Sequence, residues 1–431
     1  MSEPDGPSEL AAAAAATAAR IAAADADMHA FVPEPGRADR LAGQALELAR
    51  RWPAGTNRPP LFGVPVGVKD VIQVGGLPTT GGSALPPTAL AGPEATAVRR
   101  LREAGALIAG KTVTAEFAMV APGPTRNPLN PLHTPGGSSS GSAAAVAAGL
   151  VPLALGTQTI GSVIRPAAYC GISGFRPTHS RIPADGVLPY APSLDVVGCL
   201  ATDVAGLTRA AAVLCDDWRP ADAGRPPVLG VPAGSYLARA SEDAQLALRS
   251  QAGLLAAAGY QVREIPAFDD MAAVEQLVFV ITRYEAAAVH ADWFEKYGEL
   301  YQAATAEIIR AGRAIERDEY TTALARQGDL TGELAGLTES SGIDIWITPA
   351  ATGPAPAGLG STGDPVMSMP WSVAGWPAVT IPAGTVAGLP VGLQCVSAAG
   401  TDEQLLAWAE GMSAVLAGAA RGPGGLLDQG E

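Results

Sequence analysis

The sequence predicts an α/β fold in which helices cover a large sheet. Segments with helical periodicity alternate along the chain with short apolar segments that are typical of strands. At 94–105, for example, a helical pattern closed by Gly105 runs directly into the apolar strand pattern of 106–112. The chain has 431 residues, of which 48 % are hydrophobic and 16 % are charged. This composition supplies a sizeable core, and a large helix-covered sheet can accommodate the whole length as one unit, 1–431.

The individual elements are predicted from caps, periodicity and turn residues. Ser8 is a candidate cap for an alanine-rich helix, and Ser241 for a helix with an acidic first turn. The predicted helices cover 8–27, 37–51, 94–105, 241–259 and 401–418, with a further helix that begins near Ser142. The predicted strands cover 65–72, 106–112, 151–159, 226–232, 260–265, 343–350 and 388–397. A short strand and then a helix are expected within 181–214, and a helix and then a strand within 360–384. Three helical segments are expected in the charge-rich region 270–338, which is the candidate variable region. Residues 1–7 and 421–431 are expected to be disordered tails.

The composition also argues against several classes of protein. The net charge is −14 and no basic residues cluster, so neither nucleic acid nor a membrane is an expected partner. The N-terminus lacks the basic start of a secretory signal, and no stretch of about 20 strongly apolar residues could span a membrane. We therefore expect a cytoplasmic protein. The four cysteines and four histidines are scattered along the chain, which favours buried reduced thiols and indicates no metal site.

The region 134–178 carries the most informative chemical pattern. A glycine- and serine-rich loop with Ser138, Ser139 and Ser140 leads through small residues into the strand 151–159. A second tight turn follows, and four backbone N–H groups would converge there, those of Thr159, Ile160, Gly161 and Ser162. A serine hydroxyl on a tight turn, beside N–H groups that can hold an oxyanion, suits acyl transfer. The alternative is an ordinary strand-to-helix turn with serines that cap local backbone groups.

Lys69 lies within an apolar strand pattern, VPVGVKDVI. A lysine in such a position either extends to the sheet edge or is buried. Burial disfavours the charged form and lowers the pKa, and a neutral lysine amine can act as a general base.

Several segments, in the same order along the chain, resemble the amidase signature family. They read PPLFGVPVGVKDVIQVGGLPTTGGS at 59–83, GGSSSGSAAAVAAG at 136–149, GTQTIGSVIRPAAYCGISGFRPT at 156–178, SLDVVGCLATDV at 193–204, WSVAGWPAVTIPAG at 371–384 and GLPVGLQCVSAAGTDEQLL at 388–406. The resemblance covers nearly the whole chain. It implies a single α/β/α domain around a large mixed β-sheet.

The resemblance also implies a Ser–cis-Ser–Lys triad. By motif position Ser162 is the nucleophile, Ser138 the bridging serine on a cis peptide after Gly137, and Lys69 the base. The turn 159–162 would hold the oxyanion, and no metal or organic cofactor takes part. Activity should then rise with pH as Lys69 loses its proton.

Two departures from the family pattern concern the nucleophile turn. The family usually has glycine where Ile160 stands, and an isoleucine there would narrow the substrate pocket. Members also often have aspartate at the position of Gln158. Both changes bear on the substrate more than on the triad.

Substrate binding is expected at Arg165, Gly137 and Ser139. Arg165 either makes structural contacts to loop carbonyls and acids or pairs with a substrate carboxylate. The spelling SVIRP at 162–166 resembles members, of the malonamidase and biuret-hydrolase type, that act on half-amides of dicarboxylic acids or carboxylated ureas. The rest of the pocket is expected from 270–338 and from the loop 353–369. Asp364 and Met367 of this loop, and Trp371 just after it, could line the pocket or pack.

The predicted function is hydrolysis of a C–N bond in a small carboxamide, with release of ammonia. The alternative is a glutamine-hydrolysing subunit of a tRNA-dependent amidotransferase, which would need a partner. A catalytically silent homologue is disfavoured by the intact Lys69, Ser138 and Ser162. The resemblance is compatible with a homodimer and with a small partner subunit.

Overall fold

The structure, a computed structural model, describes residues 6–420. One mixed β-sheet organises this part of the chain. Its strands are β1 (Pro65–Lys69), β2 (Leu107–Thr112), β3 (Leu153–Gln158), β4 (Ser173–Arg176), β5 (Val196–Ala201), β6 (Val228–Ala233), β7 (Gln261–Pro266), β8 (Ile345–Pro349), β9 (Ala378–Val386) and β10 (Leu389–Val396). They form a 10-stranded sheet in the order β2-β1-β3-β5-β4-β9-β10-β8-β6-β7. Strands at the two ends run parallel to their neighbours, whereas β5, β4, β9 and β10 pair antiparallel. The predicted mixed sheet is therefore confirmed.

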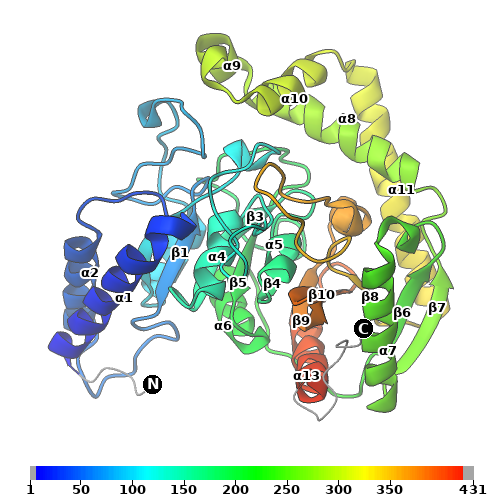
Figure 1. The fold of residues 1–431 in the computed structure, drawn as a ribbon, viewed down its shortest axis with the longest axis horizontal. Helices are drawn as coiled ribbons and strands as arrows, with labels where there is room; N and C mark the ends of the chain where they lie inside the picture. Colours follow the sequence, from blue (N-terminus) through cyan, green and yellow to red (C-terminus); the bar gives the residue numbers. More distant parts are fainter. Residues whose placement is uncertain (1–5, 421–431) are drawn as a thin grey trace.

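Helices cover both faces of the sheet (Figure 1). The α-helices are α1 (Pro7–Met28), α2 (Arg37–Arg51), α3 (Thr96–Glu103), α4 (Ser140–Ala147), α5 (Ile164–Tyr169), α6 (Val204–Leu214), α7 (Glu242–Ala257), α8 (Met271–Val289), α9 (Ala291–Tyr297), α10 (Ala303–Arg313), α11 (Arg317–Ser341), α12 (Met369–Val373) and α13 (Asp402–Ala420). Helices α3, α6, α7 and α13 bury their apolar sides in the largest core cluster, together with side chains from most strands. Helices α4 and α5 pack on the opposite face, and α1 and α2 pack beside the β2 edge.

The region beyond the sheet differs from the sequence expectation in one respect. Four α-helices, α8 to α11, occupy 271–341 where three segments were expected, because the chain breaks at His290, between Tyr297 and Ala303, and between Arg313 and Arg317. They extend past the sheet at the top of the view in Figure 1. The start of α10 contacts the segment that follows β2, since Glu116 accepts hydrogen bonds from the N–H of Gln302 at 3.0 and 3.2 Å.

The predicted caps have different outcomes at α7 and α1. Ser241 accepts a hydrogen bond from the N–H of Ala244 and caps α7, as predicted. Ser8 does not cap α1, which begins one residue earlier at Pro7 with Gly6 before it. Proline suits the first turn of a helix because its missing N–H would have no partner there. The remaining residues of the expected tails, 1–5 and 421–431, lie outside the described residues.

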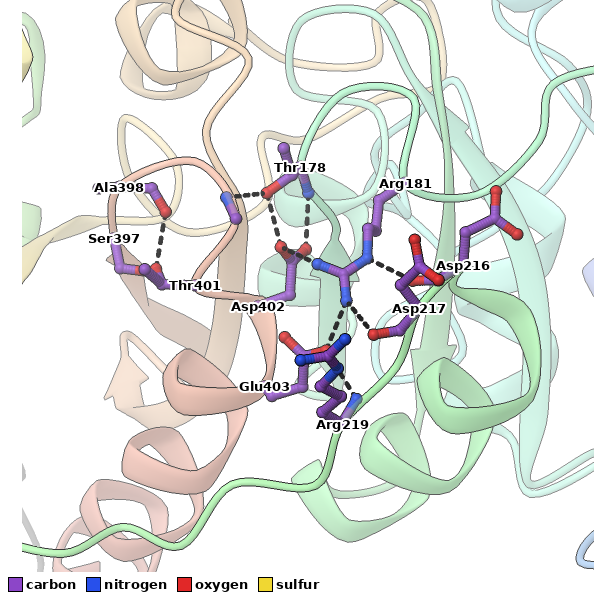
Figure 2. A network of polar contacts seen from close by, with 11 residues as sticks. Thr178, Arg181, Asp216, Asp217, Arg219, Ser397, Ala398, Thr401, Asp402 and Glu403 are labelled. Atoms are coloured by element: carbon purple, nitrogen blue, oxygen red, sulfur yellow. Dashed lines mark hydrogen bonds and ion pairs between the residues drawn. The ribbon is translucent and has the colours of Figure 1, made fainter.

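A network of polar contacts fastens α13 to the loop after β4 (Figure 2). Asp402 is fully buried and accepts hydrogen bonds from the N–H and Oγ1 of Thr178 at 2.7 and 2.6 Å. Arg181 forms ion pairs with Asp402 and Glu403 and donates to the carbonyl of Asp216. Because the charged groups of Arg181, Asp402 and Glu403 are paired within the network, we infer that the network stabilises the fold.

The four cysteines are free and buried, as expected. Burial raises the pKa of the Cys199 thiol to about 12, so this thiol stays protonated at neutral pH. Within 6–420, no helix combines the length and apolar character needed to cross a membrane.

Gly141 allows α4 to pack directly against neighbouring backbone, and we expect Gly141→Ala to lower the free energy of unfolding by about 2 kcal/mol. An added Cβ would lie 2.1 Å from the Ala30 carbonyl oxygen and 2.4 Å from the Val113 nitrogen. Gly253→Ala in α7 is the matched control, because nothing lies within 4 Å of its Cβ position. That variant should gain up to about 1 kcal/mol from helix propensity. Urea unfolding measures both, and equal stability of the two variants would contradict the packing argument.

Candidate active site

Lys69 is buried at the end of β1, with no exposed surface. Its Nζ donates to Ser138 Oγ at 2.7 Å, to Thr157 Oγ1 at 2.7 Å and to the Thr157 carbonyl at 3.3 Å. Burial holds the pKa of Lys69 well below its usual value of 10.5, against the opposite effect of Asp195, and Arg165 lowers it further. Of the two sequence alternatives for Lys69, the structure therefore shows the buried one.

Ser138 follows a cis peptide bond from Gly137, as the resemblance implied. Its hydroxyl is 2.7 Å from Lys69 Nζ, and the residue is almost completely buried. The neighbouring Ser139 donates from Oγ to the Thr157 carbonyl and accepts from the Thr157 N–H, both at 3.2 Å. Both hydrogen-bonding roles of the Ser139 hydroxyl are thus taken by β3.

The turn after β3 presents unused backbone donors. Among the described residues, no hydrogen bond is donated by any of its four N–H groups, those of Thr159, Ile160, Gly161 and Ser162. Gln158 fixes the turn, because its Oε1 accepts from the N–H groups of the two residues that follow the turn, Val163 at 2.9 Å and Ile164 at 3.0 Å. Donors fixed in this way can bind an oxyanion without prior reorganisation.

Gln158 also reaches α12 through its amide nitrogen. Nε2 donates to Ser372 Oγ at 3.2 Å, and Ser372 in turn donates to the Ile160 carbonyl. Gln158, which stands where the family often has aspartate, therefore links the turn 159–162 to α12.

Ser162 opens onto a cavity of about 560 Å³. The residue is 9 % exposed, whereas Ser138 and Lys69 are 1 % and 0 % exposed, so Ser162 is the member of this group that a ligand reaches. The cavity walls are 118–122, 159–162 with Arg165, Tyr190, 302–304 at the start of α10, 360–363 and Pro365. Neither Gly137 nor Ser139 lines this cavity.

Arg165 is buried beside the turn 159–162, and one nitrogen of its guanidinium has no hydrogen-bond partner among the described residues. Nε donates to the Thr362 carbonyl at 2.7 Å, and Nη2 donates to the Gly137 carbonyl at 2.7 Å and to Thr362 Oγ1 at 3.2 Å. Nη1 has no hydrogen-bond partner among the described residues, and no described carboxylate forms an ion pair with Arg165. Burial lowers the pKa of Arg165, while Tyr169 and Asp364 act in the opposite direction. Nη1 lies against the turn, 3.0 Å from the place where a Cβ on Gly161 would stand.

Ile160 lines the cavity and packs against an apolar cluster of α8, α11 and α12. An isoleucine at this position therefore packs the turn 159–162 against the helices of 271–341. The expected wall regions 270–338 and 353–369 both contribute to the cavity, but not through the three candidate side chains there. Met367 and Trp371 are buried in a separate apolar cluster, and Asp364 caps the N–H of Val366 at 2.9 Å.

Two polar residues at this site were missed in the sequence. Thr157 holds Lys69, and Asp195 accepts a hydrogen bond from Thr159 Oγ1 at 2.5 Å. Their local patterns, GTQT and SLD, carry no chemical signal by themselves. No group of three or more His, Cys, Asp or Glu side chains within 6–420 could hold a metal ion.

The fold and this site together define an α/β enzyme with a buried lysine, two serines and a turn of free backbone donors. Comparison with known proteins gives the family, because the family model Amidase matches residues 12–406. A glutamyl-tRNA(Gln) amidotransferase subunit from Roseiflexus sp. (strain RS-1) is 33 % identical over 438 residues, which cover 90 % of this chain and 89 % of that protein.

Solved structures agree with this match. A protein described as an amidase has a TM-score of 0.84 and 32 % identity, covering 95 % of this chain and 96 % of its own. A protein from a vestigial complex, described as revealing the origins of an s-triazine catabolic enzyme, has a TM-score of 0.83 and 28 % identity, covering 95 % of each chain. The chain belongs to the Amidase family. It is a hydrolase of carbon–nitrogen bonds in linear amides other than peptide bonds.

Proposed function

We propose that this enzyme hydrolyses the C–N bond of a small carboxamide through an acyl-enzyme on Ser162 and releases ammonia. The observation that carries the proposal is the contact of 2.7 Å between the buried Lys69 Nζ and Ser138 Oγ, next to the turn that bears Ser162. A lysine whose pKa is held low by burial can be neutral at working pH and accept a proton.

In the proposed first half-reaction Ser162 Oγ attacks the amide carbonyl carbon. Its proton passes to Ser138 Oγ, while the Ser138 proton passes to Lys69 Nζ. The carbonyl oxygen becomes an oxyanion that the free N–H groups of 159–162 bind. The C–N bond then breaks, and the proton returns from Lys69 through Ser138 to the leaving nitrogen, which departs as ammonia.

In the second half-reaction water attacks the acyl-enzyme. One water proton passes by the same relay to Lys69, and the tetrahedral intermediate forms again on the turn. Collapse breaks the bond to Ser162 Oγ, which recovers a proton through Ser138. The products are a carboxylic acid and free enzyme, so atoms and charge balance without any further reactant.

Arg165 supports an acidic amide as the substrate. Its guanidinium is buried at the cavity, has no carboxylate partner among the described residues and keeps Nη1 without a hydrogen bond. A substrate carboxylate would supply the missing charge and acceptor. We therefore propose a half-amide of a short dicarboxylic acid, or a carboxylated urea of the biuret type, as the substrate class. Ammonia release from these compounds, from neutral aliphatic and aryl amides and from glutamine tests the proposal.

Arg165→Met is expected to reduce selectivity for an acidic amide by roughly 100-fold, because it removes the cation that a carboxylate would pair with. The measurement is the ratio of kcat/KM for malonamate to that for 3-methylbutanamide, in which an isopropyl group replaces the carboxylate. Arg165→Lys is the companion variant, since it keeps the charge while losing the fork geometry. An equal loss on both substrates would assign Arg165 to structure alone.

The second candidate is hydrolysis of glutamine within an amidotransferase. The relative from Roseiflexus, 33 % identical, is named as one of the subunits of such an enzyme, and glutamine also carries a carboxylate. A partner subunit is proposed with this candidate, and the vestigial complex of the second structural relative makes a partner relevant to the first candidate too. Ammonia release from glutamine by the isolated chain, at a rate above that from malonamate, would favour the second candidate.

A further inference from the structure

Asp195 lies near the proposed base, at the end of the sheet where β1 and β3 finish and the antiparallel β5 begins. Strands β1, β3 and β5 are neighbours, with β1 parallel to β3 and β3 antiparallel to β5. Lys69 ends β1, Thr157 lies next to the last residue of β3, and Asp195 directly precedes β5. Asp195 and Thr157 also line one small internal cavity.

The carboxylate of Asp195 holds the nucleophile turn. Oδ1 accepts from Thr159 Oγ1 at 2.5 Å, and Oδ2 accepts from the N–H groups of Tyr190 and Ala191 at 2.8 and 3.0 Å. The backbone donors therefore fix the carboxylate, and the carboxylate fixes the first residue of the turn 159–162. Asp195 forms no ion pair with a described basic residue, so its charge is not consumed by a close partner.

The charges around Lys69 make Asp195 its counter-charge. Asp70, the adjacent residue in sequence, forms a buried ion pair with Lys111 at 2.7 Å. Asp195 favours the protonated form of Lys69, whereas Arg165 disfavours it. The other charged groups that face Asp195 are Arg176 at the end of β4 and Glu285 of α8.

We propose that Asp195 is a positioning residue of the hydrolysis, with two separable effects. It orients the oxyanion turn through Thr159, and it supplies the negative charge that stabilises Lys69 while Lys69 carries the proton from Ser162. Asp195 exchanges no proton in this scheme. The inference rests on the proposed roles of Ser162 and Lys69.

The experiment measures the rate at which a small alkyl fluorophosphonate labels Ser162, by intact mass, from pH 5 to pH 10. This probe needs no knowledge of the substrate: the serine oxygen bonds to phosphorus, fluoride leaves, and the serine proton goes to the base. Ser162→Ala is measured in parallel. If the wild type is not labelled, or Ser162→Ala is labelled equally fast, the proposed function itself fails.

Two variants then separate the effects of Asp195. Asp195→Asn removes the charge, so the neutral form of Lys69 is favoured and the midpoint of the pH–rate curve should move down by about one pH unit. Thr159→Val keeps the charge and loses the hydrogen bond, so the rate should fall by about tenfold with an unchanged midpoint. Thr159→Ser, which retains the hydroxyl, should restore the wild-type rate.

Two results would contradict the proposal. If folded Asp195→Asn has an unchanged pH–rate midpoint, Asp195 is not the counter-charge of Lys69. If Thr159→Val is labelled at the wild-type rate, the contact of Asp195 with Thr159 does not orient the turn. If Asp195→Asn does not fold, as thermal unfolding would reveal, the Thr159 pair still decides the orienting effect. The role of Asp195 as counter-charge is then tested by measuring the wild-type pH–rate curve at several ionic strengths. Salt hardly screens a buried pair, so the midpoint of the curve should not change with added salt, and a midpoint that moves with salt overturns this role.

Discussion

Replacement of Ser162 by alanine is expected to reduce ammonia release by roughly 10⁴-fold or more, because it removes the proposed nucleophile beside the free donors of 159–162. The oxyanion turn and the substrate pocket stay in place in this variant. Substrate should therefore still bind while the acyl-enzyme no longer forms. Ammonia release from malonamate, coupled to glutamate dehydrogenase, is the measurement.

Ser140→Ala is the matched control for this variant. Ser140 belongs to the same serine-rich segment, but its hydroxyl makes only a long contact of 3.4 Å to the Val113 carbonyl. We expect it to keep its activity within about tenfold of wild type. Ammonia release that survives Ser162→Ala would exclude the acyl-enzyme mechanism, and an equal loss in both variants would point to misfolding of the segment.

Replacement of Lys69 by methionine is expected to reduce kcat/KM by roughly 10³-fold, since it removes the proton acceptor while preserving most of the buried volume. In the wild type kcat/KM should rise with pH as Lys69 loses its proton. Because burial holds the pKa of Lys69 well below 10.5, that rise should be complete well below the pH at which an ordinary lysine loses its proton. The residual activity of Lys69→Met should lack this rise.

The pH profile of Lys69→Met also controls for other titrating groups. Burial raises the pKa of Asp195 to about 6, so Asp195 also titrates on the acid side of the profile in both proteins. A rise above neutral pH that is identical in wild type and Lys69→Met would contradict the assignment of Lys69 as base.

The helices around the site illustrate how far local sequence patterns extend. Ser241 and the acidic turn after it predicted α7 correctly, because a cap acts within one turn of the chain. In 270–338 the same approach gave three helices where the structure has four. The break at His290 carries no proline or glycine signal, and Gly298, which follows α9, does not by itself locate the start of α10 at Ala303. Tertiary contacts, such as Glu116 to the N–H of Gln302, decide where α10 begins.

For the site, sequence motifs were sufficient to select the candidate residues. Lys69, Ser138 and Ser162 come from short distinctive segments, and the α/β class followed from the alternation of periodicities. The contact of 2.7 Å between Lys69 and Ser138 joins residues that lie 69 positions apart. A motif specifies local backbone conformation, so this contact depends on the pairing of β1 with β3 and on the hydrogen bonds that join Ser139 to Thr157 of β3.

The environment of these groups depends on the three-dimensional fold. The fold buries Lys69 and leaves Arg165 Nη1 without a partner among the described residues. It also places Asp195 at the end of the central strands, near Lys69 and in contact with Thr159. Burial and electrostatic fields are sums over residues that are distant in sequence, and no short pattern encodes them. The motifs of the chain therefore indicate which chemistry it carries, whereas its fold sets the protonation and orientation on which that chemistry depends.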